Sequence, residues 1–383
     1  MKKLLQLSLT IIAFTIVSCQ KDNENSIQLR TKIDANNITN STNYTSTFVD
    51  ASNNTTVDFS SGNAKLEMFK GLNNYMNLNR SQGISADVSK NLYANLGNPF
   101  IADFTTSFAS LNAANFSLKA VTASSLSLSD ANLVKQKIES DLTANATLGN
   151  SFLVTASNGV AGKLGIYAVD AKGIEVAQVI QKGLIGAFQI DYINNVLLSA
   201  GLNADNTKLV SGKNYTQLEQ NWDQAYAILT TNPIYLAGST DAVRATSEFG
   251  LGAYVWEFNK TNYNNIYLAF LKGRAAIVNN DKVELEKQAL FIRTQFEVAA
   301  VNSALGYLVK WGTSTTDATR AHAIAEGLGF IYSLRFCKTN TVDAKFSDDI
   351  LAALVGSANG FWDLTPAKIN AASATIKTKF KIN

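Results

Sequence analysis

Histidine is almost absent from this chain, and its scarcity excludes several classes of enzyme. His322 is the only histidine among 383 residues. A zinc or iron centre that needs two or three imidazoles therefore cannot be built from one chain. A Ser-His-Asp triad would have to use His322 as its base. The sequence also lacks Gly-x-Ser-x-Gly, His-Glu-x-x-His, a glycine-rich phosphate loop and an EF-hand pattern, so it carries none of these catalytic or binding motifs.

Cysteine is nearly as rare, and the residues before Cys19 predict where the protein is located. Lys2 and Lys3 precede an apolar run, Leu4 to Val17, which has the length of a signal-peptide core and is too short to span a bilayer. Ile16-Val17-Ser18-Cys19 then has the form of a lipobox. We therefore expect residues 1–18 to be a lipoprotein signal peptide and Cys19 to carry the lipid.

The residues after Cys19 extend this prediction. Gln20-Lys21-Asp22-Asn23-Glu24 resembles the charged export tag of bacteroidete-type lipoproteins, which implies a lipid-anchored protein of the outer membrane that faces the cell surface. Residues 19–44 are rich in Asn, Thr and Ser, as is typical of a flexible tether. Cys337 is then left without a partner for an intramolecular disulfide, and we expect it to be a small buried residue at a helix end.

The chain is close to neutral, so its charge gives no reason to expect a nucleic-acid partner. The 33 basic and 30 acidic residues give a net charge of +3, and removal of Lys2 and Lys3 with the signal peptide would leave +1. No long basic block is present. A hydrophobic content of 46% with 16% charged residues is that of a globular protein.

Proline is also scarce, which favours long helices. The three prolines lie at predicted breaks, and Thr365-Pro366 is a good start for a last helix. Asp281 is a candidate N-cap for the most regular apolar pattern. Apolar periodicity predicts helices over 62–79, 85–96, 128–145, 170–200, 215–230, 243–279 with a break near 259–264, 281–311, 316–337, 346–356 and 366–380.

The predicted fold class is all-α: a bundle of long antiparallel helices preceded by a small N-terminal β-hairpin. The two β-rich runs of the hairpin are Thr45 to Asp50 and Thr55 to Ser60. The helical domain covers 45–383, either as one bundle or as two sub-bundles that meet near 200–243. Residues 100–127 fit short helices or a loop equally well.

His322 lies in the most informative of the predicted helices. Ile324, Leu328 and Ile331 form one apolar face of the segment 319–334, and a polar stripe of His322, Glu326, Gly329 and Ser333 runs beside it. His322 and Glu326 are four residues apart and therefore adjacent on a helix. The stripe either faces a polar cavity, as half of a metal or acid–base site, or is an ordinary His–Glu pair on a partly exposed helix.

A second polar pair, Glu219 and Asp223, lies on the predicted helix 215–230 beside a core stripe. Two acids one turn apart repel each other unless a cation, a ligand or a basic side chain lies between them. Arg274 is a candidate partner because Gly273 and Ala275 would let a neighbouring helix approach closely, and that pairing would be structural. The predicted helix 170–200 carries three further polar residues, Glu175, Gln178 and Lys182, which are likewise candidates for structural pairing.

Several stretches, read in order, resemble a bacteroidete lipoprotein family known only as a domain of unknown function, and the likeness covers most of residues 45–380. The stretches are Thr47 to Ser60, Gly173 to Gln178, Lys182 to Ala187, Trp222 to Tyr226, Ala269 to Ile277 and His322 to Gly327. More distantly, His322 followed by Glu326 is similar to the Gly-x-His-x-x-Glu motif of imelysin-like proteins. That family is linked to iron or haem uptake. Here the spacing is one residue longer, and Arg320 stands at the position of the glycine.

These observations lead to one functional expectation and two alternatives. We expect a non-enzymatic ligand-binding or accessory protein of envelope uptake, linked to iron or haem and acting with an outer-membrane uptake receptor. His322, Glu326, Glu219 and Asp223 would line its polar cavity. The first alternative is a hydrolase with His322 as base, and the second is a glycan-capturing surface lipoprotein. The glycan alternative needs exposed aromatic residues, whereas Trp222, Trp256 and Trp311 lie on predicted helix faces with core neighbours.

Overall fold

The computed structural model describes residues 28–232 and 248–382. The signal peptide and Cys19 lie outside these residues, so their assignment stays a prediction. The division into two sub-bundles also stays a prediction, because residues 233–243 of the proposed junction are not described.

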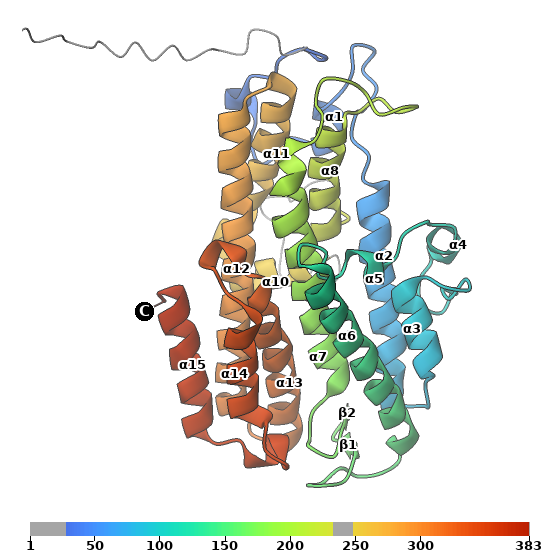
Figure 1. Cartoon of the computed structure of the whole chain (residues 1–383), viewed down its shortest axis with the longest axis vertical. Helices are drawn as coiled ribbons and strands as arrows, with labels where there is room; N and C mark the ends of the chain where they lie inside the picture. Colours follow the sequence, from blue (N-terminus) through green and yellow to red (C-terminus); the bar gives the residue numbers. More distant parts are fainter. Residues whose placement is uncertain (1–27, 233–247, 383) are drawn as a thin grey trace, which may run out of the picture.

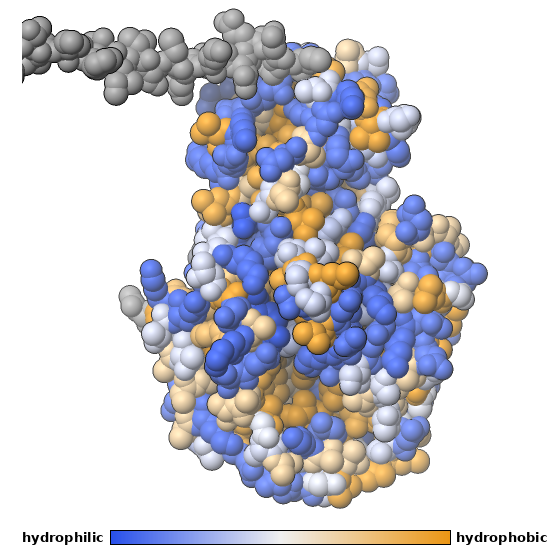
Figure 2. Space-filling model, in the orientation of Figure 1, coloured by the Kyte–Doolittle hydropathy of each residue, from blue (hydrophilic) through white to orange (hydrophobic). Residues whose placement is uncertain are grey.

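The described residues form an elongated helical bundle, as predicted, which is narrow at one end and wider at the other (Figures 1 and 2). Its longer helices are α2 (Ser60–Met76), α3 (Ala86–Ala94), α6 (Leu128–Leu148), α7 (Val176–Leu184), α8 (Gln217–Leu229), α10 (Leu251–Phe258), α11 (Tyr263–Asn279), α12 (Lys282–Thr313), α13 (Asp317–Ser333), α14 (Ala344–Val355) and α15 (Pro366–Phe380). Short helices are α1 (Tyr44–Thr47), α4 (Phe108–Asn112) and α5 (Leu118–Val121). A π-helix, η4 (Ile185–Leu197), continues α7.

Single 3-10 turns connect many of these helices. They are η1 (Ala35–Asn37), η2 (Asn77–Arg80), η3 (Gly149–Ser151), η5 (Ala200–Asn203), η6 (Lys260–Asn262), η7 (Leu334–Phe336), η8 (Lys338–Asn340) and η9 (Gly360–Asp363). The predicted break near 259–264 is η6, between α10 and α11. Segment 100–127, which the pattern left open, contains the short helices α4 and α5.

The helix starts follow the predicted capping residues. Asp281 accepts a hydrogen bond from the backbone N–H of Glu284 at the start of α12. Thr365 accepts one from Lys368 at the start of α15, with Pro366 in the first turn. Both caps satisfy backbone donors that the first helical turn leaves unpaired.

The two-stranded sheet lies at a different place from the predicted hairpin. The antiparallel strands β1 (Gly162–Leu164) and β2 (Tyr167–Val169) pair Lys163 with Ala168. The predicted hairpin region instead forms α1 and one isolated antiparallel bridge between Val49 and Thr55. Tyr44 and Phe48 are completely buried, because this segment packs into the bundle rather than projecting from it.

The predicted flexible tether also needs correction where the structure describes it. From Gln28 onward the chain follows the narrow end of the bundle, where the Gln28 amide donates to the carbonyl oxygen of Val278 at 2.8 Å. The Asn279 side chain pairs with both the N–H and the C=O of Ile33, at 2.8 and 2.7 Å. Residues 28–44 are therefore part of the folded domain, and the rest of the predicted tether lies outside the described residues.

The long helix α12 organises the packing, because it contacts α11 on one side and α13 and α15 towards the wider end (Figure 1). Helix α7 packs against α13, and α8 packs against α2. Trp222 and Trp311 are buried and Trp256 is half-buried against the core, as their helical positions indicated. Cys337 is completely buried at the end of η7, as predicted. Within the described ranges, no helix combines the length and apolar character needed to cross a bilayer.

Candidate functional site

His322 lies on α13 at the wider end of the bundle, where its ring is held on two sides. The imidazole stacks on the Tyr167 ring of β2, with ring centres 4.2 Å apart and planes 9° from parallel. Its Nδ1 lies 2.6 Å from Oε2 of Glu175. About a quarter of the histidine side chain remains exposed, 27%, whereas Glu175 is buried. The ring therefore has a fixed orientation and one accessible edge.

Two cations neutralise the two carboxylates beside His322. An Arg80 guanidinium N–H donates to Oε1 of Glu175 at 2.5 Å. The Nζ atom of Lys182 lies 2.8 Å from Oε1 of Glu326. The other carboxylate oxygen of Glu326, Oε2, lies 3.6 Å from Nε2 of His322. Burial alone would raise the pKa of Glu326, but the positive charge of Lys182 lowers it below its usual value. Glu326 is thus held as an anion by the amine beside it.

A surface pocket of about 310 Å³ opens beside this group. Helices α12 and α13 and strand β2 contribute the residues that line it: Tyr167, Tyr307, Lys310, Thr313, Ser314, Thr319, His322, Ala323 and Glu326. Tyr254 lies behind the pocket, where its hydroxyl donates to Glu326 at 3.4 Å. The lining combines aromatic faces, hydroxyl groups, one amine and one carboxylate, which suits a small polar ligand.

The hydrogen-bond network assigns a role to each ring nitrogen. The Nδ1–H group donates to Glu175, which fixes the tautomer and leaves Nε2 for the pocket side. A separation of 3.6 Å from Glu326 is too long for a hydrogen bond, so Nε2 is available to a ligand. A buried carboxylate that orients a partly exposed histidine is also the arrangement found in general-base sites.

The same geometry fits a bare metal ion poorly. Within the described ranges, no group of three or more His, Cys, Asp or Glu side chains is placed to hold a metal ion. Glu175 and Glu326 already pair with Arg80 and Lys182, and a metal would have to displace those cations. Since breaking a buried ion pair leaves an uncompensated charge, that exchange is costly.

Glu219 and Asp223 belong to a different cluster, so the prediction of one cavity lined by all four residues is wrong. Both lie on α8, at the narrow end of the bundle, away from the strands that flank His322 (Figure 1). Arg274 pairs with Glu219 at 2.8 Å and with Asp223 at 3.0 Å. The structural ion pair proposed for Arg274 is therefore confirmed.

The N-terminal segment completes this second cluster. Arg30 binds both carboxylate oxygens of Glu219, at 2.7 and 2.8 Å. The Tyr44 hydroxyl donates to Asp223 at 2.9 Å, and Arg274 donates to the Thr56 hydroxyl at 3.0 Å. These contacts fill the space between the two acids with protein groups, so the pair holds the N-terminal segment on the bundle.

Sequence reasoning named some of the residues around His322 but did not bring them together. Glu175 and Lys182 were named only as candidates for structural pairing, like Arg274, without a partner. Tyr167 and Arg80 were missed, because an exposed-looking tyrosine and arginine carry no local pattern that points to a histidine far along the chain.

Comparison with known proteins gives a family and no function. Residues 35–383 match the family described as "Domain of unknown function (DUF4856)". The chain belongs to this family. The match begins within the N-terminal segment that packs on α8 and α11, in keeping with its place in the folded domain. No curated protein and no solved structure matches the chain.

Proposed function

We propose that this DUF4856 protein is a non-enzymatic ligand-binding protein of the cell envelope, with its binding site in the His322 pocket. One observation carries the proposal: a partly exposed histidine, oriented by the buried Glu175, presents its second nitrogen at a surface pocket of about 310 Å³. A structural His–Glu pair on a solvated helix would need neither a buried carboxylate behind the ring nor a stacked tyrosine. The lipobox at Cys19 supports an envelope location, on the surface of the outer membrane.

The chemistry of the pocket favours a small organic ligand with polar groups. Tyr167 and Tyr307 provide aromatic faces, Glu326 and Nε2 of His322 accept hydrogen bonds, and Lys310 donates one. An iron-linked role, through the distant likeness to imelysin-like proteins, would need the metal to arrive within such a ligand or as haem. His322 would then be the first side chain to contact it. An outer-membrane uptake receptor is the partner that this role implies.

Titration calorimetry tests this proposal on the purified mature protein. The probes are haem and iron(III) citrate, a small organic iron complex, compared between the wild-type protein and His322→Ala; bare iron(II) and zinc(II) are the negative controls, because the pocket fits a bare ion poorly. We expect at least one probe to bind with a dissociation constant below about 100 μM, roughly −5.5 kcal/mol, and the His322→Ala variant to lose at least tenfold. Asp317→Asn, on the exposed first turn of the same helix, is the matched control. If no probe binds, or if His322→Ala binds equally well, the proposal fails.

One observation favours hydrolysis as a second candidate. The Glu175–His322 pair has the orientation of the acid and base of a catalytic triad. However, in the part of the chain that the structure describes, no Ser, Thr or Cys side chain is hydrogen-bonded to His322, so the base would have to activate water. Hydrolysis of p-nitrophenyl esters that is lost in both His322→Ala and Glu175→Gln would support this candidate, and turnover that survives His322→Ala would remove it.

A further inference from the structure

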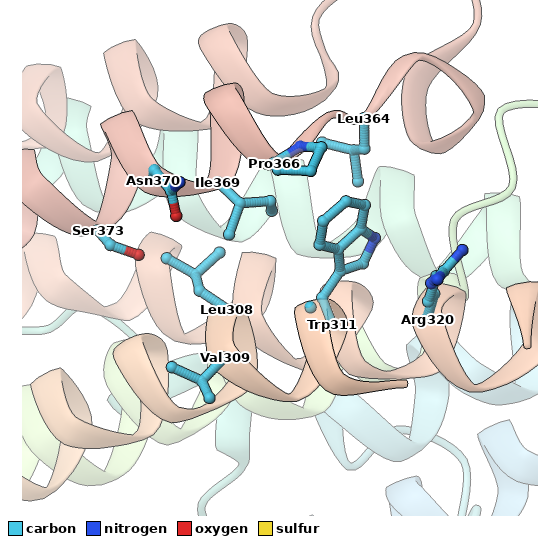
Figure 3. A pocket seen from close by; sticks show the side chains of 10 residues that line it. Leu308, Val309, Trp311, Arg320, Leu364, Pro366, Ile369, Asn370 and Ser373 are labelled. Atoms are coloured by element: carbon cyan, nitrogen blue, oxygen red, sulfur yellow. The ribbon is translucent and has the colours of Figure 1, made fainter. Parts of the chain in front are cut away.

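A second pocket, of about 430 Å³, lies between the C-terminal half of α12 and helix α15 (Figure 3). Its walls are mainly apolar: Leu308 projects from α12, Pro366 and Ile369 from α15, and Leu364 from the chain just before α15. It shares no lining residue with the His322 pocket, so an inference drawn from it does not depend on the proposed function.

Trp311 forms one wall and brings an unsatisfied hydrogen-bond donor. The residue is only 8% exposed, and its Nε1 is buried without an acceptor among the described residues. Figure 3 shows this nitrogen on the side of the ring that faces Arg320. A buried N–H without a partner is unfavourable, so an acceptor that reaches it from the pocket gains a hydrogen bond without displacing one.

Arg320 places a positive charge at the same end of the pocket. Its guanidinium carbon lies 5.9 Å from the centre of the Trp311 ring, and its Nε donates to the carbonyl oxygen of Ser314 at 3.1 Å. The nearest acid, Asp317, lies 3.7 Å from Nη1, beyond hydrogen-bond distance. The guanidinium therefore keeps several donors for a ligand. The opposite end, lined by Asn370 and Ser373, carries no charge (Figure 3).

We propose that this pocket binds a medium-chain alkanoate. The carboxylate would accept hydrogen bonds from Arg320 and from Nε1 of Trp311, and the hydrocarbon chain would lie against Leu308 and Ile369. A guanidinium pairs with a carboxylate through two parallel hydrogen bonds, which gives the charged end a defined orientation. Each methylene group removed from water strengthens binding, so the apolar walls select for chain length. A cation is excluded from the Arg320 end by its charge.

Isothermal titration with octanoate and with 1-octanol tests the proposal on the mature protein. The two probes share a chain and differ in charge, so their comparison isolates the role of the carboxylate. We expect octanoate to bind with a dissociation constant below about 1 mM and 1-octanol to bind at least tenfold more weakly, a tenfold ratio being about 1.4 kcal/mol. Absence of octanoate binding, or equal binding of the two probes, would overturn the proposal.

Two substitutions separate the charge from the indole donor. Arg320→Gln should lower the affinity for octanoate to that for 1-octanol. Lys345→Gln, which removes an exposed charge on α14, is the control and should leave the affinities for both probes unchanged. Trp311→Phe keeps an aromatic wall and should weaken octanoate binding about threefold to tenfold. In the wild-type protein, octanoate should also shift the indole N–H resonance of Trp311, a readout that does not depend on affinity. Octanoate binding that survives Arg320→Gln unchanged would contradict the assignment.

The His322→Ala variant distinguishes this proposal from the proposed function. Octanoate should bind that variant as it binds the wild-type protein, because the two pockets have separate linings. If octanoate binding is lost together with His322, the alkanoate belongs to the other pocket and this inference fails.

Discussion

Arg274 carries a full positive charge in the interior of the bundle, and the groups around it explain why it is tolerated. Its side chain is completely buried, with Glu219 and Asp223 on one helix and Thr56 on the N-terminal segment as partners. Burial of a single charge is very unfavourable, whereas a charge with ion-pair and hydrogen-bond partners is accommodated. The arginine and its acids therefore act as one unit.

Removal of the arginine should destabilise the protein strongly. Arg274→Met keeps much of the side-chain volume but leaves Asp223 without a cation. We expect the free energy of unfolding to fall by about 3–5 kcal/mol, measured by urea denaturation at pH 7. Lys282→Met breaks an exposed pair with Glu286 and is the control, for which we expect no measurable change. A small effect of Arg274→Met would show that Asp223 is neutral in the folded protein.

Asp223 should make stability depend on pH in an unusual direction. Burial raises the pKa of this carboxyl from 3.8 to about 6, despite the opposing charge of Arg274 and the hydrogen bond from Tyr44. The folded state then binds a proton that the unfolded state has released between about pH 4 and pH 6, so the contribution of this group falls as the pH rises through that window.

Comparison with Asp223→Asn isolates this effect. The stability of the wild-type protein relative to the variant should decrease from pH 4 to pH 6.5, by at most about 3 kcal/mol. Urea denaturation at four pH values measures the difference. A difference that rises with pH would mean that Arg274 outweighs burial and that the pKa of Asp223 is lowered.

For single residues, the sequence predicts neighbours along one helix but misses partners that are distant in the chain. His322 and Glu326 were expected to be adjacent, and Nε2 of His322 lies 3.6 Å from the carboxylate. Glu175 is 147 residues away from His322 in the chain, so its role follows only from the packing of α7 against α13. Gly273 and Ala275 did signal a close helix approach, which is why the partner of Arg274 could be predicted.

The element that shows this close approach is α11. A methyl group added at Gly273 would lie 2.0 Å from the Trp222 ring of α8, and that ring is completely buried. The Trp222 Nε1–H also donates to the carbonyl oxygen of Phe270, one turn earlier on α11, at 2.9 Å. The two helices therefore meet at a glycine because no other side chain leaves room for the indole.

Two glycine-to-alanine substitutions test this packing. Gly273→Ala should lower the free energy of unfolding by about 1–3 kcal/mol, because the fully buried Trp222 must move. Gly312→Ala, on α12, meets no atom within 4 Å and should be neutral or stabilising by up to about 1 kcal/mol through helix propensity. Thermal unfolding of both variants measures the contrast. Equal effects would show that the α8–α11 contact adapts easily.

Helix boundaries were predicted well where capping residues mark them. They were predicted less well where tertiary contacts determine where a helix begins or changes its geometry. The last helix begins at Pro366 and ends at Phe380, as expected from Thr365 and the apolar pattern. The predicted helix 170–200 instead begins at Val176 and becomes the π-helix η4 from Ile185. Buried polar groups within η4, such as Gln189 and Asn194, bind backbone carbonyls of other helices at 3.0 Å. A pattern search based on 3.6 residues per turn does not detect such a change.

For the whole molecule, the folded N-terminal segment is the main departure from prediction. Its Asn, Thr and Ser residues were interpreted as a tether from composition, but several of these side chains serve as caps and turn residues. Asn43 caps α1, and Asp34 caps η1. Composition alone does not distinguish a solvated linker from a segment whose polar groups pair with the domain beneath it.

Limited trypsin digestion should report whether this segment is docked. The native protein should resist cleavage after Lys32, because Asn279 holds the backbone of Ile33 through two hydrogen bonds. Asn279→Ala should increase the rate of this cleavage at least about fivefold through local opening. Asn265→Ala, at an exposed position of the same helix, is the matched control. Equal cleavage rates, followed by intact mass, would contradict docking.

The docked segment also determines which end of the bundle would be nearest to a lipid attachment. The chain enters the bundle at its narrow end, whereas the strands beside His322 lie at the opposite, wider end (Figure 1). If Cys19 is fixed to lipid, the long axis of the bundle separates the attachment point from the histidine. The histidine would then lie at the end of the bundle farther from the attachment point, where soluble molecules and neighbouring receptors can reach it.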